Sequence, residues 1–420
     1  MGYAWRLDVC TAATLLAGVA LGAIISDTVR KQAHSSSLDS SHRHVELNDP
    51  ETQSANAAYD DYAVPRDIRV GVEGLIGNTP LMRIKSLSDA TGCDILAKVE
   101  MLNPGGSAKD RIALAIVEEA EKQGLIHPNS GDVVYEGTSG STGISLAMIC
   151  RAKGYMAHIC LPDDTSVEKI NLLKSLGAVV EMVPPASIVD KRQYVNMART
   201  RAQEQNADPN TLGRGLFADQ FENEANWRAH YEHTGPEIWR QTGGQIDAFI
   251  TGAGTGGTIS GVSRYLKPLR PQLKVVLADP PGSGLFNKVK YGVMFDVAER
   301  EGTRRRHQVD TMVEGIGINR VTCNFEAGRA YVDDAIRVTD KEAIAMARYL
   351  VENDGLFVGS STAVNCVAAA RWAKKIGRGH TIVTIICDSG VRHLSKFWKA
   401  AGSVEGESGR KVDLDSILGQ

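Results

Sequence analysis

Residues 246–279 read IDAFITGAGTGGTISGVSRYLKPLRPQLKVVLAD and carry the clearest fold signal in the chain. Two short runs rich in aliphatic and β-branched residues, 247–251 and 274–278, flank a glycine- and threonine-rich loop and a helical pattern. Strands that are apolar throughout and are separated by helices are typical of parallel sheets with both faces covered. The stretch therefore predicts an α/β fold with a ligand-type loop where the first strand meets the helix.

The loop Gly252–Thr258 also satisfies the pattern GxGxxG, and Asp279 ends the following strand. Together these features match the fingerprint of a dinucleotide-binding fold, so an NAD-dependent dehydrogenase is one interpretation. Thr255 and Thr258 instead suit direct contact with a terminal phosphate. The fingerprint also lies late in the chain, behind two other ligand-type loops that a dehydrogenase does not explain.

The same alternation extends outward from this stretch between about residue 70 and residue 400, without a repeat of fixed period. Further strands are expected at 95–100, 132–136, 157–161, 178–183 and 381–387, and helices at 110–124, 142–153, 167–177 and 340–355. A chain of 420 residues exceeds the average domain of about 150 residues, which predicts two core-forming units.

The composition is that of a globular protein, with 43% hydrophobic and 23% charged residues. The net charge of −3 gives no basic excess, so we expect no nucleic-acid partner. The seven cysteines are scattered without a CxxC pair, which argues against a disulfide framework and against a structural zinc site. We interpret all seven as core residues.

The first segment of the chain differs from the rest. Val9–Ser26 contains no charged residue, and 18 residues at about 1.5 Å each make a helix of roughly 27 Å, close to a bilayer span. A cleaved secretory signal fits poorly because Asp8 offsets Arg6, and a transit peptide should be richer in arginine. We interpret residues 1–31 as a retained membrane anchor or targeting segment.

A polar linker follows at residues 32–69, which lack an apolar period and are rich in Ser, Asp, Asn and His. The histidines within it are interpreted as solvated residues of the linker. We predict no metal site in the chain.

The loop NPGGSAKDR at Asn103–Arg111 is the first of three further candidate ligand loops. Lys109 lies at a helix start, where the partial positive charge of the helix disfavours an ammonium group. A lysine whose neutral amine is favoured suits Schiff-base chemistry, although a solvated lysine in an ordinary turn is equally compatible with this loop.

Two other loops are rich in hydroxyl groups and glycine. EGTSGSTG at Glu136–Gly143 opens a helix and could bind a carboxylate or phosphate, or could cap the helix. CDSGVRHL at Cys387–Leu394 ends the last strong strand. Its Ser389 could contact a heteroatom of a bound ring or serve as an N-cap.

Read together, the four loops resemble the cysteine synthase (O-acetylserine sulfhydrylase) branch of the fold-type II, pyridoxal-phosphate-dependent enzymes. The family's motifs occur in order: IGNTPL (76–81), NPGGSAKDR, the QFEN box (220–223), GTGGT and EGIG (314–317). The hydrophobic N-terminus, GSTG, and GVMF with the RRRHQVDT insert are further similar to the fungal mitochondrial cysteine synthase-like proteins.

The resemblance implies a role for each loop. Lys109 would hold pyridoxal 5'-phosphate as a Schiff base and later move the Cα proton, and Ser389 would face the pyridine nitrogen. The implied cofactor-binding residues are Lys109, Ser141, Gly254, Thr255, Gly256, Gly257, Thr258 and Ser389. The implied substrate-binding residues are Thr138, Ser139, Gly140, Gln220 and Gly315.

Two positions depart from the family pattern. The family has Asn where this chain has Ser141, and Pro where it has Gly137. The Asn contacts the phenolic oxygen of the cofactor, and the shorter serine side chain would need a bridging water to do so.

The resemblance implies two three-layer α/β/α subdomains with the cofactor in the cleft between them. The catalytic domain is expected at 70–400, with an N-subdomain at about 95–225, a C-subdomain at 70–94 plus 226–400, and a tail at 401–420. A homodimer in the mitochondrion, held at the outer membrane by a single-pass anchor, is also implied.

The implied reaction is β-replacement on O-acetylserine with sulfide, giving cysteine and acetate. Desulfhydrase-type β-elimination is the alternative within the class, and a dehydrogenase or a membrane-anchored pseudoenzyme are alternatives outside it. Cystathionine β-synthase is disfavoured because no haem-binding N-terminus or C-terminal regulatory domain is apparent. A neutral serine opposite the ring nitrogen makes the cofactor a milder electron sink, which favours loss of a β-substituent over transamination.

Overall fold

The computed structural model describes residues 68–186, 188–296, 311–402 and 413–419. The expected membrane anchor, nearly all of the linker, Cys10 and most of the RRRHQVDT insert lie outside these residues. Within the described ranges, no helix is both long enough and apolar enough to cross a membrane.

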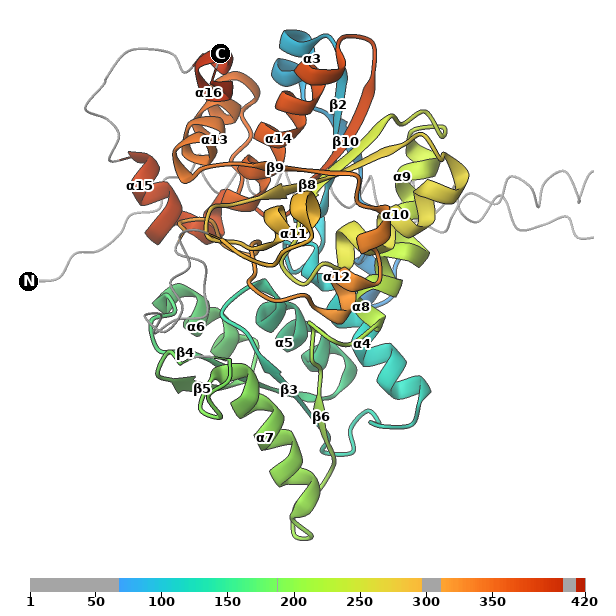
Figure 1. Ribbon diagram of the computed structural model, residues 1–420. Helices are drawn as coiled ribbons and strands as arrows, with labels where there is room; N and C mark the ends of the chain where they lie inside the picture. The colour runs from blue at the N-terminus through green and yellow to red at the C-terminus, as the bar shows by residue number, and fades with distance from the viewer. Residues whose placement is uncertain (1–67, 187, 297–310, 403–412, 420) are drawn as a thin grey trace, which may run out of the picture. The chain divides into compact units, whose positions relative to one another are not determined.

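The described chain forms two separate sheets, which Figure 1 shows one above the other. The larger sheet has the order β1 (Leu81–Arg83), β2 (Asp94–Val99), β10 (Thr381–Ile386), β7 (Ala248–Gly252), β8 (Lys274–Asp279), β9 (Asp334–Arg337). The smaller sheet has the order β5 (Val179–Val183), β4 (Met156–Pro162), β3 (Val133–Gly137), β6 (Gly215–Phe217). All pairings are parallel except that of β1 with β2. The predicted α/β fold with parallel sheets is confirmed.

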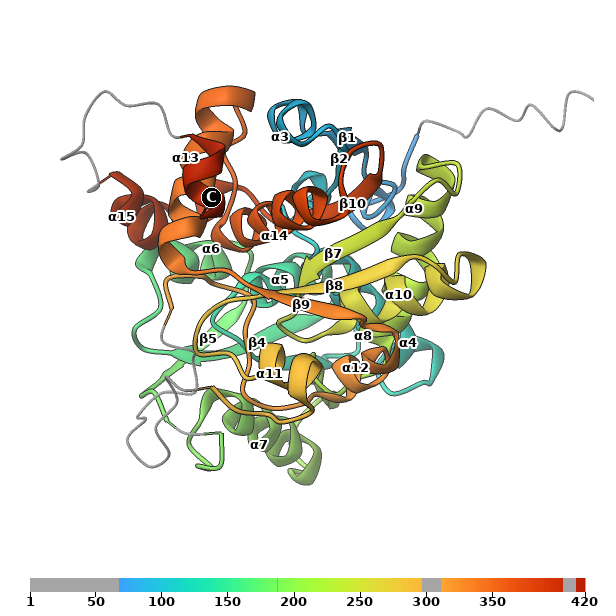
Figure 2. The same cartoon turned by 45° about the horizontal axis from the view of Figure 1, so that its top comes forward.

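Alternate residues of the strands of the larger sheet point to opposite faces, and apolar residues occur on both. Both faces are therefore covered by helices. In β7, Ala248 and Ile250 pack on one side and Phe249 on the other. Figure 2 shows the first set of helices above the sheet and the second below it. The first set is α3 (Lys85–Thr91), α13 (Asp340–Asp354) and α14 (Ser360–Ile376); the second is α10 (Gly257–Leu269), α11 (Leu285–Tyr291) and α12 (Cys323–Glu326).

The smaller sheet is covered in the same way. Apolar residues of α4 (Lys109–Lys122), α5 (Ser141–Lys153) and α6 (Val167–Ser175) pack with Val134 and Ile159 in one core. On the opposite face, α7 (Tyr194–Ala207) packs against Val133, Tyr135 and Cys160. Each sheet therefore has its own three-layer core.

Short elements complete the described part of the chain. They are η1 (Glu73–Leu75), η2 (Glu100–Leu102), α8 (Ala225–Ala229), η3 (His230–Thr234), α9 (Gly235–Gln241), η4 (Arg329–Tyr331), η5 (Gly390–His393), η6 (Leu394–Trp398), α15 (Lys399–Gly402) and α16 (Leu414–Leu418). The last of these corrects the expected tail at 401–420, because Leu414, Ile417 and Leu418 are buried in the core beside α13 and α14. Three apolar residues in five are too short a pattern for the sequence to predict a packed helix.

Two further expectations differ from the structure. The N-subdomain is expected to begin at about residue 95, whereas β2 pairs with β10 along its whole length and lies in the larger sheet. An apolar strand pattern does not specify which of two parallel sheets the strand joins. Cys323 is exposed in the first turn of α12 and is not a core residue, and the six cysteines that the structure describes are all free.

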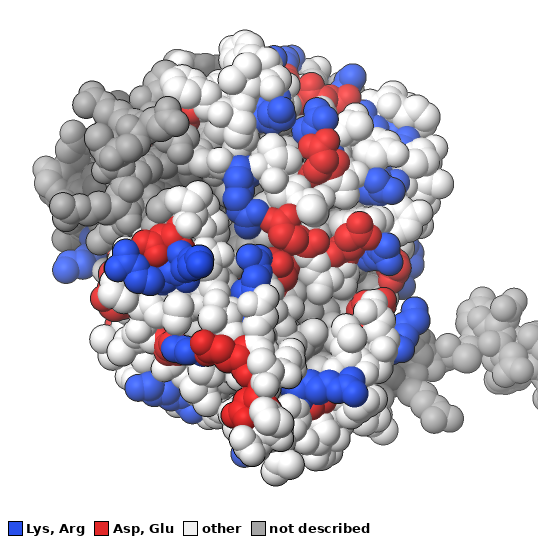
Figure 3. Space-filling model, turned by 60° about the horizontal axis from the view of Figure 1, so that its bottom comes forward, with Lys and Arg blue, Asp and Glu red and all other residues white. Residues whose placement is uncertain are grey.

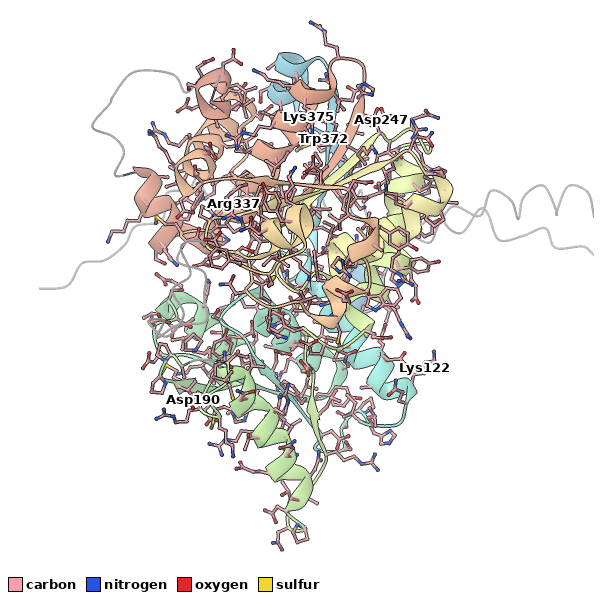
Figure 4. The ribbon with its side chains drawn as sticks, in the orientation of Figure 1. Lys122, Asp190, Asp247, Arg337, Trp372 and Lys375 are labelled. Atoms are coloured by element: carbon pink, nitrogen blue, oxygen red, sulfur yellow. The ribbon has the colours of Figure 1, made fainter. Side chains whose placement is uncertain are left out.

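The amino-terminal edge of the larger sheet is held by a structural carboxylate. Asp247, labelled in Figure 4, immediately precedes β7 and accepts hydrogen bonds from the backbone N–H of Thr381 (2.9 Å) and from Arg270 (2.8 Å). These contacts join the starts of neighbouring strands. The carboxyl edge of the sheet is left to the glycine- and hydroxyl-rich loops.

The surface face shown in Figure 3 carries Lys and Arg side chains interspersed with Asp and Glu, without a broad area of one sign. This distribution accords with a net charge of only −3 for the whole chain. That face therefore does not present the extended basic surface that polyanion-binding proteins use.

A buried network of four charged side chains joins the two sheets where the chain passes between them. The Lys98 ammonium lies 2.5 Å from Glu237, and Arg111 lies 2.7 Å from both Glu237 and Glu100. All four residues are at most 8% exposed. Burial alone would raise the pKa of Glu237, but hydrogen bonds and charge from Arg111 lower it to about 2. The network thus keeps its charges in an otherwise apolar interior.

Glu237→Gln should lower the free energy of unfolding by about 3–5 kcal/mol, because it leaves the buried Lys98 cation without its counter-charge. Urea unfolding of the full chain measures this change. The matched control is Asp89→Asn at the surface, where the carboxylate pairs with Lys85 and Arg83, and its free energy of unfolding should stay close to that of the wild type. Equal losses in the two variants would contradict a special role for the buried network.

Candidate active site

The four predicted ligand loops meet at the carboxyl edges of the two sheets. One loop follows β2 and η2, and the others follow β3, β7 and β10. The carboxyl ends of parallel strands lie at one edge of a sheet, which is where open α/β folds place their ligands. The structure therefore brings together segments that are nearly 300 residues apart in the sequence.

Lys109 is the first residue of α4, in a loop that is tied to the loop carrying Ser389. The backbone N–H of Ala108 donates to the carbonyl of Cys387 (3.2 Å), and Ser107 forms an isolated bridge with Asp388. In the part of the chain that the structure describes, the Lys109 ammonium forms neither a hydrogen bond nor an ion pair. The lysine is half-buried, so its amine is available to a ligand at this edge.

The hydroxyl loop after β3 borders open space. An added Cβ on Gly140 would meet only Thr138 Oγ1, at 4.0 Å, and one on Gly315 would meet nothing within 4 Å. Both glycines are predicted substrate-binding residues. The Thr142 hydroxyl donates to Gln220 Oε1 (2.6 Å), so the loop and the predicted Gln220 are in direct contact.

Gly137, one of the departures from the family pattern, has a steric explanation. An added Cβ there would lie 2.4 Å from Val195 Cα and 2.6 Å from the Tyr194 carbonyl oxygen. The first turn of α7 packs directly on the end of β3, and only glycine allows that approach. A proline at this position would require α7 to shift.

The glycine loop ends at the N-terminus of α10, where the first N–H groups have no carbonyl within the helix to bind. Gly256 has a φ of +87°, and a Cβ on it would strike Phe325 at 2.5 Å. Asn226 donates to Thr255 Oγ1 (3.0 Å), which orients that buried hydroxyl. A turn of this kind, with its helix dipole, is a site for an anion such as phosphate.

His230 is a residue of this site that the sequence analysis missed. Its Nε2 lies 3.2 Å from Thr258 Oγ1, and its Nδ1 lies 3.0 Å from Thr234 Oγ1. Burial, with the nearby Arg111 charge, lowers the pKa of His230 to about 3. A neutral imidazole therefore positions the Thr258 hydroxyl, and a lone histidine in a helical stretch gave no signal for this role.

The carboxylate expected of a dinucleotide-binding fold is not available to a ligand. Asp279 is fully buried and accepts a hydrogen bond from the Phe286 backbone N–H (2.8 Å). Burial raises the pKa of this carboxyl group to about 7. The residue stabilises the start of α11, so the dehydrogenase interpretation loses the ribose contact it requires.

Ser389 is the N-cap of η5, and its Oγ accepts a hydrogen bond from the Val391 backbone N–H (3.3 Å). A hydroxyl that accepts in this way still has its hydrogen to donate. The N-cap interpretation and the ligand-binding interpretation are therefore compatible. The following turn also brings Arg392 to Ser141, a contact that the sequence analysis did not predict.

Glu136 lies directly beneath the hydroxyl loop and is fully buried. Burial raises its pKa to about 8, although hydrogen bonds from Gln220 favour the charged form. The carboxyl group receives the Gln220 backbone N–H (3.2 Å) and lies 3.4 Å from the Gln220 side-chain amide. A protonated Glu136 therefore supports Gln220 from below at neutral pH.

One group of potential metal ligands occurs among the described residues, on the face of the smaller sheet that α7 covers: His158, Cys160 and Glu181. Arg201 already binds Glu181 with both its Nε and Nη2 groups, at 3.0 Å and 2.7 Å. Burial raises the pKa of the Cys160 thiol to about 12. The Glu181 carboxylate of this group is thus already paired with a cation beneath α7.

Comparison with known protein families gives one match that covers most of the chain. The family model described as "Pyridoxal-phosphate dependent enzyme" matches residues 72–388. That range contains the first three loops of the candidate site and the first two residues of the fourth, whose Ser389 lies just beyond it.

Similar proteins of known name share high sequence identity with the chain. "Cysteine synthase 2" of Emericella nidulans is 63% identical over 371 residues, which cover 85% of this chain and 87% of that protein. The "Putative mitochondrial cysteine synthase" of Saccharomyces cerevisiae is 59% identical over 370 residues, which cover 87% and 93%. The solved structure of O-ureido-L-serine synthase superposes with a TM-score of 0.68 at 29% identity and covers 84% of this chain and 100% of that one.

Glu136→Gln should remove a pH dependence from the stability of the protein. The pKa of this group rises from 4.5 to about 8 on folding, so its contribution to stability is full below pH 4.5 and is lost as the pH rises toward 8. Urea unfolding between about pH 5 and pH 8 should therefore show wild-type stability falling relative to the variant. The exposed Glu232→Gln is the control and should parallel wild type; parallel curves for Glu136→Gln would refute the assignment.

Proposed function

The chain belongs to the pyridoxal-phosphate-dependent enzymes and, within them, to the cysteine synthase family, and we propose that it makes cysteine and acetate from O-acetylserine and sulfide. The observation that carries the proposal is the meeting of Lys109, the hydroxyl loop and the glycine loop at the carboxyl edges of the sheets. Relatives named cysteine synthase, 56–63% identical over most of the chain, support the same reaction.

The residues present fit pyridoxal phosphate. The glycine loop offers an anion site at the N-terminus of α10, and the half-buried Lys109 offers an amine without a competing partner in the described chain. Open space borders Gly140 and Gly315, so the neighbouring loops leave room for a ligand. We assign Gly254, Thr255, Gly256, Gly257 and Thr258 to the phosphate, Lys109 to the covalent attachment, and Ser141 and Ser389 to the ring.

Pyridoxal phosphate, when bound, supplies an electron sink for the bond that breaks at the substrate Cα. The Lys109 amine is the base that takes the Cα proton and later returns it. The Ser389 hydroxyl donates a neutral hydrogen bond, which cannot hold a proton on a ring nitrogen as an aspartate would. This neutrality favours loss of the β-substituent over transamination.

We assign substrate recognition to the hydroxyl loop after β3, to Gln220 and to Gly315. Thr138, Ser139 and Gly140 offer hydroxyl and N–H groups to the amino-acid carboxylate, and Gln220 adds its amide. Gly315 lies on the facing loop, where a side chain would intrude into the open space. The contacts of Gln220 with Thr142 and Glu136 keep its amide oriented before substrate arrives.

Lys109→Ala should abolish cysteine formation and the visible absorbance of the bound cofactor while leaving the fold intact, because a loop lysine contributes little packing. Borohydride reduction of the wild type should label the peptide that contains Lys109. Lys122→Ala, in the last turn of the same helix (Figure 4), is the control and should behave as wild type. A label on another lysine would overturn the site, and sulfide release from cysteine faster than cysteine formation would favour β-elimination.

We also propose that the apolar run Val9–Ser26 anchors the enzyme in the mitochondrial outer membrane, with the catalytic part in the aqueous phase. The length of the uncharged run supports the anchor, and the name of the yeast relative supports the compartment. The resemblance to cysteine synthases further supports a homodimer of the catalytic part.

The full-length protein should remain in the membrane pellet of isolated mitochondria after alkaline carbonate extraction, because a spanning apolar helix resists this treatment. A variant with Leu16 and Leu21 both changed to Asp, which interrupts the run, should be released. Release of the unaltered full-length protein would rule out a spanning helix, and a mature N-terminus beyond residue 27 would indicate a cleaved targeting segment.

A further inference from the structure

Arg392 reaches from the turn after Ser389 to two other loops of the site. Its Nη1 donates to Ser141 Oγ (3.0 Å), and its Nη2 contacts the Gly105 carbonyl oxygen in the Lys109 loop. A Cβ on Gly106 would lie 3.0 Å from Nη2, so the glycine leaves room for the guanidinium. The arginine thus connects the hydroxyl loop of the smaller sheet with two loops that follow strands of the larger sheet.

The guanidinium makes these contacts without a carboxylate partner. In the part of the chain that the structure describes, no carboxylate lies within ion-pair distance of Arg392. The negative charges of Asp388 and Asp110 act on it, but Asp388 Oδ2 lies 2.9 Å from His393 and Asp110 receives the Ser145 hydroxyl. Burial lowers the pKa of Arg392, yet an arginine stays charged at any physiological pH. Its strongest donor groups are therefore directed at neutral oxygen atoms.

The contact with Arg392 determines in which direction the Ser141 hydroxyl accepts and in which it can donate a hydrogen bond. A guanidinium can only donate, so Ser141 Oγ must accept from Arg392. The hydroxyl has one hydrogen, which consequently points away from the arginine. Ser141 is the first residue of α5, and its side chain has no preceding turn of helix whose carbonyl could take that hydrogen. The structure thus leaves one donor, strengthened by a neighbouring positive charge, at the edge of the site.

We propose that Arg392 is a positioning residue, which holds the Ser141 hydroxyl as a hydrogen-bond donor toward the phenolic oxygen of pyridoxal phosphate. This inference rests on the proposed function. The asparagine of other family members meets the same requirement, because its carbonyl oxygen can accept from an arginine while its N–H donates. Serine and asparagine can therefore both accept from Arg392 and donate to the ligand at this position.

The test measures the dissociation constant of pyridoxal phosphate and the pH midpoint of its visible absorbance in the full-length protein. Arg392→Met, which keeps the length of the side chain but removes its donors, should weaken binding about two- to tenfold and shift the midpoint. In a Ser141→Ala background the same change should have a clearly smaller effect, because only the contact with Gly105 remains to be lost. Ser141→Asn should bind the cofactor as wild type does, and Arg392→Lys, which retains a donor, should recover part of the affinity.

The matched control is Arg264→Met on α10. Arg264 is half-buried and donates to a backbone carbonyl, that of Ala327 (2.7 Å), but contacts no residue assigned to the site. It should leave both readouts unchanged. Equal effects of Arg392→Met with and without the Ser141 hydroxyl would overturn the proposal, as would no effect in either. A wild-type protein that does not bind pyridoxal phosphate would instead refute the proposed function.

Discussion

The ion pairs of Arg111 and Lys98 with Glu237 connect the two sheets at the point where the chain passes from one to the other. Lys98 belongs to β2 of the larger sheet, and Arg111 lies in the first turn of α4, which packs on the smaller sheet. Their shared partner, Glu237, comes from α9, more than 120 residues later. Because Arg111 is two residues from Lys109, the network that joins the sheets also fixes the helix start that carries the candidate Schiff-base lysine.

The ionised and the neutral buried groups of this region lie in different places. Glu237 stays ionised because two cations face it, whereas Glu136, without a cation, has its pKa raised to about 8 by burial. His230 is kept neutral by burial and by nearby positive charge. Glu136 and His230 thus act as neutral hydrogen-bonding partners beneath the loops, whereas the four charged side chains of the network lie at the junction of the two sheets. Neutral groups beneath the loops shift the pKa of a bound anion less than charged groups would.

The sequence predicted most of the strands and helices and the four loops, because strand periodicity and glycine-rich turns are local signals. It could not predict that β2 joins the larger sheet or that α16 packs on the core, since these pairings depend on distant parts of the chain. The same reason explains the missed site residues. Arg392 and Ser141 are 251 residues apart, and neither residue alone indicates the other. His230 and Glu136 likewise resemble ordinary helix and strand residues until their neighbours are known.

The two departures from the family pattern follow from different neighbours and are tolerated for different reasons. At Gly137 the constraint is volume, because the first turn of α7 occupies the space of any side chain. At Ser141 the constraint is polarity, because Arg392 needs an acceptor and the cofactor, in our proposal, needs a donor. A residue that meets the first constraint must be small, whereas one that meets the second must both accept and donate. The hydroxyl loop can therefore vary in sequence while the geometry that it presents at the sheet edge is retained.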